Sequence, residues 1–158
     1  MSFKTPHTFS KTLCKSELWI HDLMKNLGWG DEQKTVIALK SVLHALRDHL
    51  PLQETVDLGS QLPMLLRGLY YEGWKPSQKL RHERHLDQFL MRVQAVFERD
   101  PNILAEEVVD AVLCLLNEHV THGEIKDIIS VLPEEVRSYW PFKSIIYDTK
   151  NTNHVFRD

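Results

Sequence analysis

The chain has 158 residues, of which 42% are hydrophobic and 26% are charged, and its formal net charge is −3. This composition is typical of a globular protein with its own hydrophobic core, and it excludes disordered and collagen-like chains. No apolar run approaches the roughly 20 residues that a membrane-spanning helix needs, so the sequence predicts no membrane span.

Residues 1–15 are expected to form an N-terminal tail. They contain three lysines, no acidic residue and several serines and threonines, and they lack the apolar segment of a secretion signal. The two cysteines, Cys14 and Cys114, form no CxxC pattern. We therefore expect a cytoplasmic protein with reduced thiols.

Residues 16–74 are predicted to form a first unit of four helices. Apolar residues at helical spacing define the first two helices; the two stripes are Trp19, Ile20, Leu23 and Leu27, then Leu39, Val42, Leu43, Leu46 and Leu50. Pro51 lies near the start of a short third helix, where proline is tolerated. Leu62-Pro63 ends that helix, because a residue before proline avoids the α region, and the proline begins a fourth helix.

Residues 75–85 read as a polar, basic connector, residues 86–143 as a second four-helix unit, and residues 144–158 as a C-terminal tail. The second unit repeats the first at an offset of 70 without gaps. The identical pairs are Val42/Val112, Leu43/Leu113, Leu46/Leu116, His49/His119, Glu54/Glu124, Asp57/Asp127, Ser60/Ser130, Leu62/Leu132, Pro63/Pro133 and Arg67/Arg137. The sequence thus predicts an all-α protein in which two tandem similar units pack into one globule, with Leu43 and Leu113 in equivalent environments.

Residues that both units share most simply serve folding. We expect Asp57 to pair with Arg67, and Asp127 with Arg137, as ionic braces across each Leu-Pro turn. Thr121 and Glu124 have the spacing of a capping box that begins the third helix of the second unit.

A longer string carries a family resemblance. Leu46-Arg-Asp-His-Leu-Pro51, followed by Leu58-Gly-Ser-Gln-Leu-Pro-Met-Leu-Leu-Arg-Gly-Leu-Tyr-Tyr-Glu-Gly-Trp74, resembles a bacterial family known only as a domain of unknown function, family number 2267. Gly123-Glu124, Asp127 and Leu132-Pro133 resemble its other half-motif. The resemblance covers about residues 16–141 and implies an all-helical bacterial cytoplasmic protein. It implies no reaction, substrate or cofactor.

The fourth helix of the first unit is the best functional candidate, because it is apolar on nearly every side whereas its counterpart carries Glu134 and Glu135. Three explanations stay open: an interface between the two units, an interface with a subunit or partner, and a small-ligand pocket. We expect Leu66 and Leu69 in the core. The residues proposed for the ligand or partner surface are Arg67, Tyr70, Tyr71, Glu72 and Trp74.

Metal and nucleic-acid sites are not expected. His82 and His85 lie one turn apart, and Cys114, His119 and His122 are close in sequence, but neither set has a second ligand pair at finger-like spacing. Residues 75–86 are basic, yet the sequence pI is about 6.3, and residues 87–158 carry 7 basic and 13 acidic residues. No nucleophile and base form a recognisable catalytic set, and no cofactor motif is present.

These observations favour a helical binding or assembly module without catalytic activity. Its partner would be another copy of the chain or another protein. The alternative is a small-ligand sensor or enzyme that uses a pocket around Arg67, Tyr70, Tyr71 and Glu72.

Overall fold

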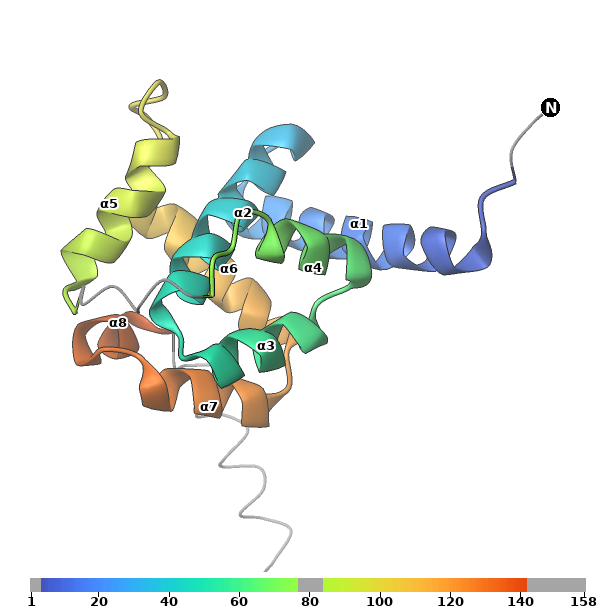
Figure 1. The fold of residues 1–158 in the computed structure, drawn as a ribbon. Helices are drawn as coiled ribbons and strands as arrows, with labels where there is room; N and C mark the ends of the chain where they lie inside the picture. The colour runs from blue at the N-terminus through green and yellow to red at the C-terminus, as the bar shows by residue number, and fades with distance from the viewer. Residues whose placement is uncertain (1–3, 77–83, 142–158) are drawn as a thin grey trace, which may run out of the picture.

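The fold is all-helical, as predicted. A computed structural model describes residues 4–76 and 84–141, and these contain eight helices and no strand (Figure 1). The helices are α1 (His7–Leu27), α2 (Glu32–His49), α3 (Leu52–Gln61), α4 (Met64–Tyr71), α5 (Leu86–Val96), α6 (Ala105–His119), α7 (His122–Val131) and α8 (Glu134–Tyr139). No helix in this part of the chain is long and apolar enough to cross a bilayer. The expected C-terminal tail, residues 144–158, and most of the connector lie outside the described residues.

Helix α1 begins inside the segment that was expected to be a tail. It starts at His7, directly after Pro6, and runs to Gly28, which ends it in the left-handed conformation with φ 69°. The first half of α1 projects from the body of the protein (Figure 1). Phe9 and Leu13 are exposed on this projecting part. The sequence offered no buried stripe here, which agrees with the exposure of these apolar side chains in the structure.

The Leu-Pro steps end helices where the sequence predicted. Leu62 and Leu132 have extended backbones, with ψ of 144° and 150°, and α4 and α8 begin directly after the prolines. Prolines at 63 and 133 cannot donate a hydrogen bond to the preceding turn, so each break leaves helix carbonyls that need other donors.

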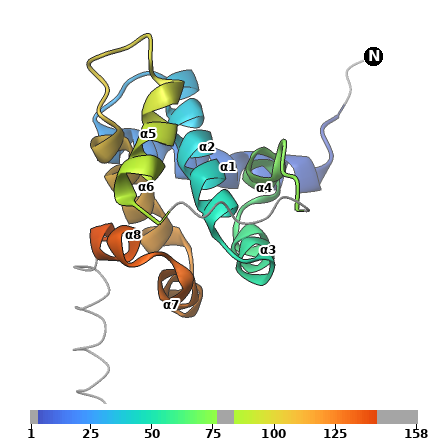
Figure 2. The same ribbon diagram turned by 60° about the vertical axis from the view of Figure 1, so that its left-hand side comes forward.

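The helices pack across the molecule in pairs. Helix α1 packs against α6 and α2 against α5, while α2 also contacts α6 and α3 lies beside α7 (Figures 1 and 2). Fully buried leucines and valines fill the space between them; they include Leu23, Val42, Leu46, Val93, Val112 and Leu116. Burial of each such side chain contributes about 1.5–3 kcal/mol to folding.

Helix α4 packs against α1, α2 and α3, all within residues 4–76. Leu66 is buried as expected and Leu69 is half-buried, but Met64 and Leu65 keep 53% and 49% of their surface exposed. The apolar first turn of α4 is thus about half exposed within the described residues, and its burial by a subunit or partner stays a prediction. Helix α1 contacts this turn, where the Leu65 N–H donates to Thr12 Oγ1 at 3.1 Å, but it leaves both side chains about half exposed.

Helix α4 and the end of α8 are tied to the central helices by hydrogen bonds from matching positions. Arg47 Nη1 donates to the carbonyls of Tyr70 and Glu72, both at 2.9 Å. Asn117, which lies 70 residues after Arg47, donates from Nδ2 to the carbonyl of Pro141 at 3.0 Å. It also accepts from Trp140 Nε1 at 2.9 Å. These bonds fix both chain segments that follow the Leu-Pro turns.

Candidate functional site

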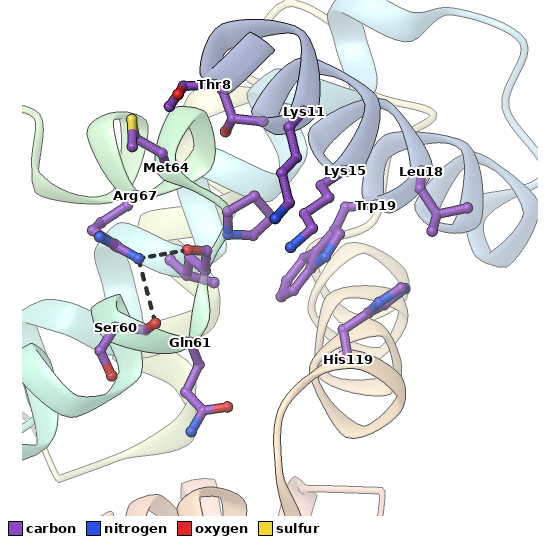
Figure 3. Close-up of a pocket in the computed structure, with 13 residues that line it drawn as sticks. Thr8, Lys11, Lys15, Leu18, Trp19, Ser60, Gln61, Met64, Arg67 and His119 are labelled. Carbon is purple, nitrogen blue, oxygen red and sulfur yellow. Dashed lines mark hydrogen bonds between the residues drawn. The ribbon is translucent and has the colours of Figure 1, made fainter.

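A cleft of about 620 Å³ opens between α1 and the turn that joins α3 to α4, beside the C-terminal end of α6 (Figure 3). Its lining comes from three separate segments of the chain. The lining residues are Thr8, Lys11, Thr12, Lys15, Leu18, Trp19, Ser60, Gln61, Leu62, Pro63, Met64, Arg67 and His119.

Helical spacing builds one wall of the cleft. Lys11, Lys15 and Trp19 follow one another at intervals of four residues, so they share one face of α1. Trp19 and Leu62 are buried beneath the cleft. The His119 ring stacks on the Trp19 ring with centroids 4.7 Å apart and an angle of 26° between the planes. The stacked pair thus forms a flat aromatic base under two long cationic side chains.

The charged groups that line the cleft are all basic. Lys11 and Lys15 are exposed, and Figure 3 shows their side chains extending from α1 into the space next to Trp19. Arg67 lines the opposite side, and no aspartate or glutamate is among the lining residues. Threonine, serine and glutamine side chains add neutral hydrogen-bonding groups. Such a surface attracts anionic oxygens, because both ammonium groups can donate to carboxylate or phosphate.

Arg67 braces the α3–α4 turn, but through carbonyls and not through Asp57. Its Nε donates to Gly59 O at 2.8 Å, and its Nη2 donates to Leu62 O at 3.1 Å and to Ser60 O at 3.4 Å (Figure 3). Within the described residues Asp57 and Arg67 form no ion pair; the Asp57 carboxylate accepts from Gln53 Nε2 at 2.9 Å. The expected partner is therefore wrong. Pro63 supplies no N–H, so the guanidinium satisfies the last carbonyls of α3 instead.

Arg137 repeats this arrangement. Its Nη2 donates to Leu132 O at 3.1 Å and to Ser130 O at 3.5 Å, at the end of α7. The described residues contain no ion pair between Arg137 and Asp127, so the prediction of this pair is also wrong. A cation at a helix C-terminus also complements the helix dipole.

The residues predicted for a ligand pocket do not converge on one space. The Tyr70 hydroxyl points into the core, where it donates to Thr55 O at 2.8 Å, and burial raises the pKa of Tyr70. Tyr71 lies over Gly59, whose missing side chain makes room for the phenol ring. Glu72 pairs at the surface with Lys40, 3.0 Å away. Arg67 alone of the proposed set faces the cleft.

The aromatic residues proposed for a ligand or partner surface form a row along the end of α4 and the turn that follows it. Tyr70 and Tyr71 have ring centroids 4.9 Å apart, and Tyr71 and Trp74 have centroids 5.3 Å apart. Tyr71 and Trp74 are half-buried. Their interfacial role stays a prediction.

The metal candidates named from the sequence are not assembled as sets. His82 lies outside the described residues, and His85 Nδ1 lies 3.0 Å from Glu135 Oε1. His119 is grouped with Asp22 and Glu118 and not with Cys114 or His122. Burial raises the pKa of the Cys114 thiol, with added effects from the nearby charges of Asp110 and Glu118. A raised pKa disfavours the thiolate, which is the form that binds metals and attacks electrophiles.

The expected capping box at α7 is not formed. Thr121 makes no side-chain cap; its hydroxyl accepts from Gln61 Nε2 and its N–H donates to Gln61 Oε1, both at 3.3 Å. Gln61 from the end of α3 thus caps α7. Glu124 instead buries Oε1, which has no hydrogen-bond partner in the described part of the chain. This burial, together with the charges of Asp57, Glu54 and Asp127, raises the pKa of Glu124 to about 7.

The raised pKa of Glu124 predicts a pH-dependent stability. The folded protein holds this proton more tightly than the unfolded chain, so stability falls as pH rises from about 4.5 towards 7. We expect Glu124→Gln to raise the free energy of unfolding at pH 8 by about 1 kcal/mol, after allowance for solvent screening, and to change it little at pH 4. Urea unfolding at both pH values checks this, with the exposed Glu106→Gln as control. Equal effects at the two pH values would contradict the assignment.

Sequence reasoning missed the two lysines of the cleft because it placed them in a tail. It also assigned Trp19 to the core alone. One signal was available: Lys11, Lys15 and Trp19 continue a single helix face at four-residue spacing. The position of His119 beside Trp19 depends on the packing of α1 against α6, which no local pattern reveals.

The fold and its repeated Leu-Pro turns define a small all-helical domain with a basic cleft. A family model described as an uncharacterized conserved protein, DUF2267, matches residues 16–139, and the chain belongs to this family. The resemblance found in the sequence is thereby confirmed. Comparison with curated proteins gives no match.

Proposed function

We propose that the protein is a non-catalytic binding module that takes an acidic segment of a protein partner into the cleft between α1 and the α3–α4 turn. One observation carries this proposal: every charged side chain that lines the cleft is basic. Carboxylates of a partner would meet Lys11 and Lys15, which are exposed and not committed to ion pairs among the described residues. Arg67 is partly occupied by the carbonyls of α3, so it serves mainly to shape the cleft.

Exposed apolar side chains beside the cleft favour a polypeptide over a small anion. Leu18 and Met64 line it and are 55% and 53% exposed. Leu13 and Leu65 line a neighbouring hollow of about 310 Å³, and the Leu65 N–H donates to Thr12 Oγ1 at 3.1 Å, which joins α4 to α1. A partner segment with both carboxylates and apolar residues would use both features.

We further propose that the fold arose from two copies of one four-helix unit, residues 16–74 and 86–143. The bounds of α3 and α7 differ by 70 at both ends, and Leu43 and Leu113 are equally buried. In the two units α1 corresponds to α5, and α2 corresponds to α6. The contact between α1 and α6 therefore has a counterpart in the contact between α5 and α2, and both contacts are present. The contact between the Trp19 and His119 rings likewise has a counterpart in the contact between Phe89 and His49, whose ring centroids lie 5.4 Å apart. These pairs support an approximate twofold relation.

The two thiols fit a protein that works in a reducing compartment, which we take to be the bacterial cytoplasm. Cys14 is exposed, Cys114 is half-buried, and both are free.

Binding to a labelled acidic peptide tests the proposed function. We expect fluorescence anisotropy to detect binding of a short peptide of glutamate and leucine, and weaker binding of the same peptide with glutamine in place of glutamate. The double variant Lys11→Ala/Lys15→Ala should weaken binding about tenfold, because each exposed ionic contact contributes up to about 1 kcal/mol. Rising salt should weaken binding to the wild type.

Lys25→Ala is the matched control, because Lys25 is exposed on the same helix and does not line the cleft. It should bind like the wild type. Equal affinity for the glutamine peptide, or equal loss in the control, would contradict the proposal. Binding of pyrophosphate with no binding of the peptide would reassign the cleft to a phosphate-bearing ligand.

A further inference from the structure

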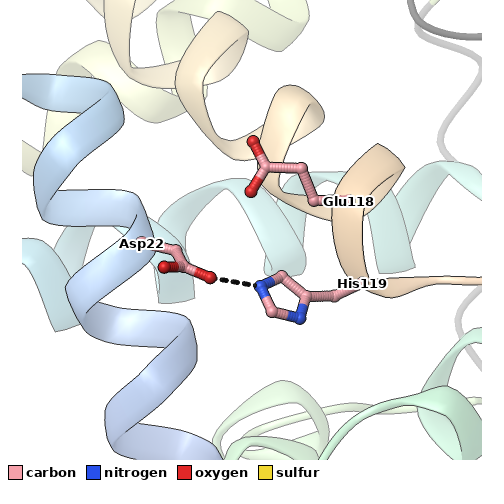
Figure 4. A group of neighbouring side chains, drawn as sticks. All are labelled: Asp22, Glu118 and His119. Carbon is pink, nitrogen blue, oxygen red and sulfur yellow. Dashed lines mark hydrogen bonds and ion pairs between the residues drawn. The ribbon is translucent and has the colours of Figure 1, made fainter.

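Behind the His119 ring, α1 and α6 bring together three side chains that can bind a metal. His119 Nε2 lies 2.7 Å from Asp22 Oδ2, and Glu118 extends from the preceding position of α6 (Figure 4). One donor atom from each residue lies within 4.8 Å of the other two. The side chains of Asp22 and His119 are 25% and 18% exposed, and Glu118 is exposed. The group is thus held on two helices and is open to solvent on one side.

The matching place between α2 and α5 contains a cation of the protein itself. Arg92 lies 70 residues after Asp22, and Asp48 lies 70 residues before Glu118. Arg92 Nη1 is 3.4 Å from Asp48 Oδ2. Asp22 therefore takes the position that the Arg92 guanidinium has at the matching place. As a result, the carboxylates of Asp22 and Glu118 lie near each other beside His119. In the described residues neither Asp22 nor Glu118 pairs with a lysine or arginine.

The donor set identifies the class of ion. One imidazole nitrogen and two carboxylate oxygens suit Zn²⁺ and related transition metals, whereas Mg²⁺ and Ca²⁺ prefer oxygen ligands alone. Ligands on one such ion lie within about 4.2 Å of one another, and the exposed Glu118 side chain can close the remaining gap. The stacked Trp19 ring orients the imidazole. We propose that Asp22, Glu118 and His119 bind a divalent transition-metal ion of the Zn²⁺ type, with water completing the coordination.

Calorimetric titration of the metal-free full chain with ZnCl₂ tests this site, and it does not depend on the proposed function of the cleft. We expect one Zn²⁺ per chain and no comparable binding of Mg²⁺. Glu118→Gln should weaken Zn²⁺ binding about tenfold or more. This variant should fold, because Glu118 is exposed and makes no described hydrogen bond. Asp22→Asn should weaken binding to a similar extent while it keeps a side chain that can contact His119.

Three variants separate this site from other zinc ligands on the surface. Glu107→Gln, on the same face of the same helix, and His21→Ala, next to Asp22, should bind like the wild type. Cys114→Ser should also bind normally, although Cys114 lies one turn before Glu118. Absence of Zn²⁺ binding would overturn the proposal. Binding that Cys114→Ser or His21→Ala abolishes, and that Glu118→Gln and Asp22→Asn leave intact, would overturn it as well.

Discussion

Arg47→Met is expected to lower the free energy of unfolding by about 3 kcal/mol, because it removes a buried guanidinium that makes three hydrogen bonds. Arg47 is 6% exposed, and its Nη1 donates to two carbonyls at the end of α4. Its Nε donates to Asp48 Oδ1 at 3.0 Å. Methionine fills similar space but donates no hydrogen bond. The partly buried carbonyls of Tyr70 and Glu72 therefore lose these donors.

Urea unfolding followed by tryptophan fluorescence measures this loss. Arg47→Lys keeps the charge but not the planar fork of donors, so we expect a smaller loss of about 1–2 kcal/mol. Arg99→Met, at an exposed position, should stay within about 0.5 kcal/mol of the wild type. If Arg47→Met is as stable as this control, then Arg47 does not hold α4 against α2.

The sequence predicts most of the helices correctly because the signals that define them, apolar spacing and prolines, lie within each helix or at its ends. Apolar spacing locates α2 and α6, and the prolines at 63 and 133 end α3 and α7 at the predicted residues. The start of α1 was missed because its projecting turns bury little apolar surface. A stripe of apolar residues predicts a helix only where one side of that helix is buried. The exposed side chains of Met64 and Leu65 illustrate a second limit: an apolar helix face does not identify the neighbour that covers it.

The predicted ion pairs failed for a physical reason that spacing alone does not show. Opposite charges ten residues apart suggested that Asp57 would meet Arg67. The proline between them leaves carbonyls without amide donors, and the guanidinium bonds to these in preference to the Asp57 carboxylate, which accepts from Gln53 Nε2 instead. The cleft and the Asp22–His119 contact could not be predicted from the sequence for another reason. Both join α1 to residues far along the chain, and they arise only when α1 packs against α6.

The second large effect is expected for Trp140→Ala, which should lower the free energy of unfolding by about 3–5 kcal/mol. Trp140 follows α8 and is 1% exposed, and it is the largest of the fully buried side chains in the described residues. Its removal leaves a cavity between α8 and α6 and deletes the hydrogen bond from Nε1 to Asn117 Oδ1. Trp140→Phe also deletes this bond but keeps one ring in the core, so it leaves a smaller cavity than Trp140→Ala. We expect it to cost about 1–2 kcal/mol.

Thermal and urea unfolding of these variants also test the proposed duplication. Tyr70 of the first unit corresponds to Trp140 of the second, and both side chains are fully buried. Tyr70→Ala should therefore destabilise the protein about as much as Trp140→Ala. Met91→Ala is the control, because Met91 is 68% exposed and its truncation should change stability by no more than about 0.5 kcal/mol. A Trp140→Ala protein that unfolds like this control would show that the end of α8 does not pack on α6 in solution. A large effect at Trp140 with a small one at Tyr70 would instead mean that the two units are built differently, and the duplication would lose its energetic basis.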